Sequence, residues 1–175
     1  MEWGTRMVLH CSRKLAQRLP DVSASALAEI SALGGWHGHL VVMDRRQCVL
    51  FCHDATRYVL FLPGLRKPQF HALGNTWLRH LFAASLAILG CTDTQVRKAE
   101  LALGQVQYDV ATDRSVQASL RVAALDLEAW LWRQVPDVMN ADPLAAAHWL
   151  NQRPTRAQGQ LLWPNQAMFD LISAL

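Results

Sequence analysis

Three short apolar runs in the first half of the chain are separated by polar turns. The runs are Trp36–Met43, Cys48–Cys52 and Tyr58–Leu62, and the turns between them are Asp44–Gln47 and His53–Thr56. Short β-rich runs that are joined by a few polar residues are typical of antiparallel hairpins. The pattern therefore predicts a three-stranded antiparallel meander.

Helical periodicity follows this meander. Between Gln69 and Leu89 apolar residues recur at intervals of three and four, which predicts an amphipathic helix that ends at Gly90. Alternating apolar residues predict strands at 7–10 and 106–110. Helical spacings and capping residues predict helices at 12–18, 92–103, 113–134, 143–152 and 165–175. Residues 22–33 form either a short helix or an ordered loop.

The order of these elements predicts the class of fold. Runs of strands followed by runs of helices indicate an α+β fold and not a parallel doubly wound one. We expect an antiparallel β-meander, with strands from both ends of the chain, packed against several α-helices. The 175 residues suit one core. We assign residues 1–6 to an N-terminal extension and residues 7–175 to a single domain.

The chain is mildly basic and rich in tryptophan. It has 17 Lys and Arg against 14 Asp and Glu, a formal net charge of +3, which is well below the charge of a dedicated nucleic-acid binder. Seven Trp stand against two Tyr. Tryptophan is frequent both in cores and at interfaces, so the excess fits either place.

The cysteines and the apolar stretches indicate a compartment. The first residues lack the apolar segment of a signal peptide, and the longest apolar stretch, Leu81 to Cys91, is too short to span a bilayer. None of the four cysteines forms a CxxC pair. Cys11, before a basic helix, is either a thiolate that the helix start stabilises or a buried thiol. We expect a cytoplasmic protein with no membrane association, no metal site and no cofactor.

His37 and His39 are the candidate catalytic residues. They lie two positions apart on a predicted strand, so their side chains share a face. Two imidazoles on one face could move protons, or could bind a metal if Cys48, Cys52 or His53 supplied a third ligand. Because a lone pair of histidines lacks the other ligands that zinc needs, the alternative is a half-exposed pair without a chemical role.

Four residues are candidates for anion binding. Arg45 and Arg46 lie in a predicted turn, where two guanidinium groups could hold a phosphate or a carboxylate. Arg114 and Ser115 lie at the predicted start of a long helix, where free N–H groups attract anions. We expect one anion pocket if the two pairs meet in space. The alternatives are a solvated turn and an ordinary helix cap.

Several ordered motifs carry a resemblance that covers the chain from Met7 onward. They are Leu33-Gly-x-Trp36, the hairpin Asp44-Arg-Arg-x-Cys-Val-Leu-Phe51, a Thr112-x-Arg-Ser-Val116 helix start and Leu150-Asn-x-x-Pro154. Together they resemble an uncharacterised bacterial domain family, although the threonine stands one residue closer to the arginine than in the family pattern. The resemblance implies a cytoplasmic bacterial protein in a mobile-element or defence context, and it assigns no catalytic residue.

The motifs of known enzymes are absent from the sequence. We find no phosphate-binding loop, dinucleotide fingerprint, serine elbow or HExxH. The function is therefore unknown from sequence. Our first interpretation is a binding protein that recognises nucleic acid or a protein partner in a plasmid-linked or defence module. The alternatives are a phosphodiester- or nucleotide-processing enzyme with an Arg-lined pocket, and a structural or regulatory homo-oligomer.

Overall fold

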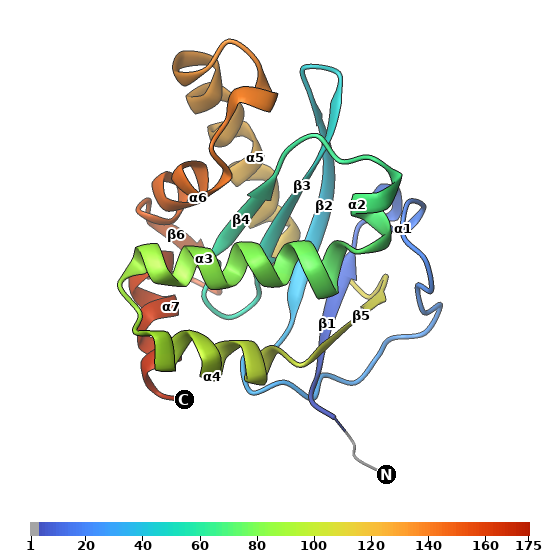
Figure 1. The fold of residues 1–175 in the computed structure, drawn as a ribbon, viewed down its shortest axis with the longest axis vertical. Helices are drawn as coiled ribbons and strands as arrows, with labels where there is room; N and C mark the ends of the chain where they lie inside the picture. Colours follow the sequence, from blue (N-terminus) through green and yellow to red (C-terminus); the bar gives the residue numbers. More distant parts are fainter. Residues whose placement is uncertain (1–3) are drawn as a thin grey trace.

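A five-stranded mixed sheet forms the centre of the computed structural model, which describes residues 4–175 (Figure 1). The strand order is β4-β3-β2-β1-β5. The strands are β1 (Arg6–Cys11), β2 (Trp36–Met43), β3 (Arg46–His53), β4 (Val59–Leu62) and β5 (Gln105–Asp109). Strands β2, β3 and β4 pair antiparallel, whereas β1 lies parallel to both β2 and β5. The predicted α+β class and the antiparallel meander are confirmed.

The first hairpin of the meander closes with a two-residue turn. Met43 pairs with Arg46, so only Asp44 and Arg45 lie between the strands. Both have positive φ angles, 49° and 63°. This is the conformation of a type I′ turn, whose twist matches that of the flanking strands.

Helices cover both faces of the sheet. On one face α3 (Arg79–Leu89), α4 (Asp93–Leu103) and α7 (Pro164–Ser173) enclose the larger core, which contains Trp36 and Phe82. On the other face α5 (Arg114–Gln134) buries every third or fourth residue against β2 and β3. Figure 1 shows α3 in front of the sheet and α5 behind it.

The edge of the sheet at β4 is covered by α6 (Pro143–Asn151). Asn151 at the end of this helix is buried, and its side-chain amide bonds both backbone groups of Val59. The amide thus replaces the neighbouring strand that β4 lacks. A covered edge cannot pair with another chain.

Several elements differ from their predicted extents. The helix expected over 69–89 is divided into α2 (Lys67–His71), a π-helical turn η1 (Leu73–Leu78) and α3. The N-terminal helix α1 (Arg13–Ala16) is shorter than expected, and residues 22–33 form the ordered loop and not a helix. The hairpin of β6 (Thr155–Ala157) and β7 (Gln160–Leu162) and the 3₁₀ turn η2 (Val138–Asn140) were not predicted.

The predicted N-terminal extension is described only in part. Residues 1–3 lie outside the described residues, and β1 begins at Arg6, one residue before the predicted start of the domain. Within residues 4–175, no helix has both the length and the apolar composition that crossing a membrane requires.

Candidate anion-binding site

A cavity of about 470 Å³ opens where β1 ends beside a longer neighbour. β1 stops at Cys11, opposite Gly38, while β2 continues to Met43. The chain turns from β1 into α1, and α5 passes over the same region. The carboxyl end of a parallel strand is a frequent place for ligands. The lining residues are Cys11, Ser12, Arg13, His37, Gly38, His39, Val110, Thr112, Gln117, Leu120 and Arg121.

The charged residues of this lining are basic. Arg13 comes from α1 and Arg121 from α5, and neither Asp nor Glu is among the residues that line the cavity. Ser12, Thr112 and Gln117 add groups that can donate hydrogen bonds. Guanidinium groups in a partly enclosed space favour bidentate binding of a phosphate or carboxylate.

His39 lines this cavity together with Arg13 and Arg121. Burial lowers the pKa of His39 below its usual range, and the positive charges of Lys14 and Arg121 lower it further. The imidazole is therefore neutral at pH 7 and can accept a proton when an anion enters. Both predicted catalytic candidates, His37 and His39, line the cavity.

His37 also lines the cavity, and both of its ring nitrogens bond other segments of the chain. Its Nε2 accepts the backbone N–H of Asp113 at 2.8 Å, and its Nδ1 lies 2.7 Å from Oδ1 of Asp54. Because Nε2 accepts, a neutral ring carries its proton on Nδ1 and donates it to Asp54. Both nitrogens are thus occupied, and His37 positions the loop that leads into α5.

A second histidine–aspartate pair lies beside His37. Nδ1 of His10 is 2.6 Å from Oδ1 of Asp109, and the rings of His10 and His37 are 4.9 Å apart. Asp109 is fully buried and also accepts the backbone N–H groups of Leu27 and Ala111. Sequence reasoning missed this pair, because 99 residues separate its members and no local spacing marks them.

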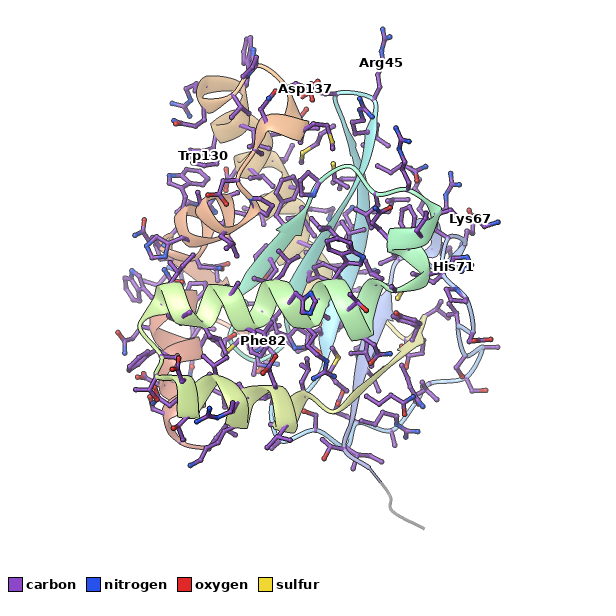
Figure 2. All side chains as sticks on the ribbon, in the orientation of Figure 1. Arg45, Lys67, His71, Phe82, Trp130 and Asp137 are labelled. Atoms are coloured by element: carbon purple, nitrogen blue, oxygen red, sulfur yellow. The ribbon has the colours of Figure 1, made fainter. Side chains whose placement is uncertain are left out.

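The structure does not bring the predicted arginine pairs together. Arg45 and Arg46 are exposed at the tip of the β2–β3 hairpin, and Figure 2 shows Arg45 pointing away from the molecule. Arg114 follows Asp113, which bonds His37 near the opposite end of β2. Six residues of strand, about 20 Å, separate these two ends. No single pocket can include both pairs.

The start of α5 is occupied by groups of the chain itself. The side chain of Asp113 accepts the N–H groups of Ser115 and Val116, and these bonds hold the pKa of its carboxyl below the usual range. The hydroxyl of Ser115 accepts from the guanidinium of Arg57 at 2.8 Å. Arg114 is exposed at the first turn. Arg57 thus binds this helix start, a contact that the sequence did not predict.

Comparison with known families supplies the broader context for these residues. The sequence matches the family described as domain of unknown function DUF6933 over residues 8–167. The chain belongs to this family. The predicted resemblance to an uncharacterised domain family is confirmed, and the match spans both the cavity and the sheet. A comparison with curated proteins finds no match.

The cysteines of this DUF6933 chain are buried thiols. Cys11, Cys48, Cys52 and Cys91 are all unpaired. Burial raises the pKa of the Cys11 thiol, and the charge of Asp109 raises it further. The thiolate interpretation of Cys11 is therefore wrong, and its thiol donates to the carbonyl of Leu9. Among residues 4–175, no group of three His, Cys, Asp or Glu side chains could hold a metal ion.

Proposed function

We propose that this DUF6933 chain binds a phosphate-bearing ligand, a nucleotide or a single-stranded nucleic acid, in the cavity between β1, β2 and α5. The observation that carries the proposal is the lining: Arg13 and Arg121 line a cavity that no carboxylate lines, and neutral His39 lines it with them. A bound phosphate would stabilise the protonated imidazole and gain a third cation. Affinity is then expected to rise as the pH falls from neutrality toward the lowered pKa of the free His39.

The size and position of the cavity favour a small anionic ligand and not a long nucleic-acid duplex. A volume of about 470 Å³ lies within the range of small-ligand sites. The net charge of +3 is well below that of a protein dedicated to binding a duplex. The four unpaired, buried cysteines are typical of a reducing compartment, which supports the cytoplasmic location that the sequence predicted. The proposed plasmid-linked or defence module remains a prediction.

The proposal is tested by direct binding. A labelled single-stranded oligonucleotide and a mononucleotide are titrated at low salt, and their affinities are compared for the wild type and the double variant Arg13→Gln/Arg121→Gln. A hydrogen bond to a charged group contributes about 1.5–3 kcal/mol, so the variant should bind at least about tenfold more weakly. The matched control is Arg45→Gln/Arg46→Gln, which removes two exposed arginines at the tip of the β2–β3 hairpin, outside the lining of the cavity.

Either of two results would contradict the proposal. One is unchanged binding by the cavity variant; the other is an equal loss in the hairpin control, which would transfer the site to Arg45 and Arg46. Absorbance of the purified protein before and after a high-salt wash shows whether nucleic acid is already bound, since phosphate contacts weaken with salt.

The position of His39 supports a second candidate function, hydrolysis of a phosphodiester or nucleotide. A neutral imidazole beside two guanidinium groups can serve as a general base while the cations stabilise charge on phosphate oxygens. Release of phosphate or nucleotide is measured for the wild type and for His39→Gln. If hydrolysis is detected and His39→Gln retains the full rate, this function is excluded in the form stated.

A further inference from the structure

Helix α5 carries two apolar faces on opposite sides. One face, which includes Leu120 and Leu127, is buried against the sheet. On the other side five residues are exposed at alternating spacings of four and three, the spacing of a coiled-coil seam. We call these the outer stripe of α5: Ala118, Val122, Leu125, Ala129 and Trp132.

The large apolar side chains of the outer stripe are unusually exposed. Leu125 is 68% exposed and Trp132 is 87% exposed. The stripe runs for about 21 Å along the helix. A hollow of about 470 Å³ borders its C-terminal half, between α5 and the tip of the β2–β3 hairpin. Contiguous apolar surface of this kind marks an interaction site.

We propose that the outer stripe of α5 pairs antiparallel with the outer stripe of a second copy of this chain. With a two-fold axis at the level of Leu125, Trp132 of one copy lies opposite Ala118 of the other, Val122 lies within one residue of Ala129, and the two copies of Leu125 meet on the axis. Trp132 and Val122 thus each meet an alanine. A two-fold contact requires such self-complementarity, because the same surface serves both copies.

The charges beside the stripe support the same pairing. Arg121 and Glu128 flank one side of the stripe, seven residues apart. In the antiparallel pair each Arg121 meets Glu128 of the other copy, so the axis creates two ion pairs. On the other side Asp126 is already held by Arg153 at 2.6 Å, so the pairing depends on Arg121 and Glu128. Charge complementarity of this kind sets the partner and its orientation.

The proposal does not rest on the cavity function. A contact centred on one helix is small beside the roughly 800 Å² per partner of a standard interface, so we expect roughly micromolar dissociation. Sedimentation equilibrium of the ligand-free chain over a wide range of concentrations measures it. The mass should rise from 19.6 kDa toward twice that value. A mass that stays at 19.6 kDa at every concentration would overturn the proposal.

Substitutions locate the contact. Leu125→Arg places a charge in the stripe at an exposed position, so it should abolish the dimer without unfolding the chain. The matched control is Leu101→Arg on α4, where the side chain is 77% exposed. Loss of the dimer in the control but not in Leu125→Arg would transfer the interface to α4 and overturn the assignment.

A charge reversal tests the orientation. Glu128→Arg should weaken the dimer about tenfold, because it sets like charges against each other across the axis. Adding Arg121→Glu should restore the affinity of the wild type, since the ion pairs form again with exchanged signs. If the double variant stays as weak as the single one, the antiparallel pairing is incorrect.

Discussion

His53 connects the end of β3 to two loops. Its ring is completely buried, with Nδ1 2.8 Å from the hydroxyl of Thr56 and Nε2 against the carbonyl of Leu33. Because the backbone N–H of Thr56 also points at Nδ1, this nitrogen accepts and Nε2 donates. The folded protein therefore uses the neutral form of this histidine.

The neutral His53 makes stability depend on pH. Burial lowers the pKa of His53 below the value of about 6.5 that it has in the unfolded chain. Below about pH 6.5 the unfolded chain therefore binds a proton that the folded chain excludes. The free energy of unfolding has its highest value above about pH 6.5 and falls as the pH decreases. His53→Gln should reduce this fall, measured by urea unfolding at neutral and mildly acidic pH.

The effect of His53→Gln on the pH dependence of stability is compared with the contributions of His39 and of a surface histidine, His71. Because the pKa of His39 is also lowered, part of the pH dependence should persist in His53→Gln. His71 is exposed on α2, and His71→Gln should leave the dependence as in the wild type. An unchanged dependence in His53→Gln would show that the ring takes up a proton in the folded protein as readily as in the unfolded chain.

For single residues, the sequence predicted which side chains lie together better than it predicted what each side chain bonds. The prediction that His37 and His39 share a face followed from the alternation of a strand, and both line the cavity. That His37 is fully bonded could not be predicted, because its partners Asp54 and Asp113 come from two other segments. Arg13 and Arg121 were not predicted as a pair, since only the fold brings α1 and α5 together.

At the level of elements, the π-helical turn η1 depends on one glycine. The backbone N–H of Gly74 donates to the hydroxyl of Tyr108 at 2.8 Å, and a Cβ at this position would lie 2.3 Å from Cγ1 of Val106. The helix thus approaches β5 more closely than any side chain allows. Periodicity alone predicted a continuous helix here, because the spacing of apolar residues does not report how closely a helix approaches a strand.

Gly74→Ala should therefore destabilise the fold. Overpacking costs about 1–3 kcal/mol, and a contact this short belongs at the upper end, which exceeds the gain of about 1 kcal/mol in helix propensity. Thermal or urea unfolding measures the change. Gly4→Ala, where a Cβ would meet nothing within 4 Å, should be neutral. A stabilised Gly74→Ala would show that η1 can move away from Val106.

The meander and the caps were the elements that sequence predicted best. β2 has the predicted bounds. Of the caps that the sequence offered, Thr92 (or Asp93), Asp113 (or Ser115) and Asp142, it is Thr92, Asp113 and Asp142 that accept from the first turns of their helices. These features depend on neighbours in sequence. The short hairpin of β6 and β7 was missed because three-residue strands carry too little alternation to be recognised.

At the scale of the whole molecule, Asn151 fixes α6 to the sheet. Replacing it by leucine keeps the branched shape, although the side chain is larger, and leaves the N–H and C=O of Val59 without partners. Since each unpaired buried group costs about 1–3 kcal/mol, Asn151→Leu should lose about 2–4 kcal/mol in urea unfolding and should aggregate more readily through β4. The exposed neighbour variant Gln152→Leu should change neither. Wild-type stability in Asn151→Leu would show that water replaces the amide.

The pairing of distant strands could not be predicted from sequence. The class of fold followed from the order of strands and helices, but nothing in residues 7–10 or 106–110 indicates that they lie parallel and adjacent. The position of the cavity depends on this pairing, because the end of β1 beside the longer β2 creates it.

The inner position of β1 also determines when the chain can fold during its synthesis. Within this domain β1 is made before the other strands, yet one of its two neighbours, β5, is made about a hundred residues later. Until Gln105–Asp109 emerges, the nascent domain has β1 as an unpaired edge beside the meander. Because non-local pairing of this kind is slow, this part of the nascent chain stays open to chaperones and proteases until β5 has been made.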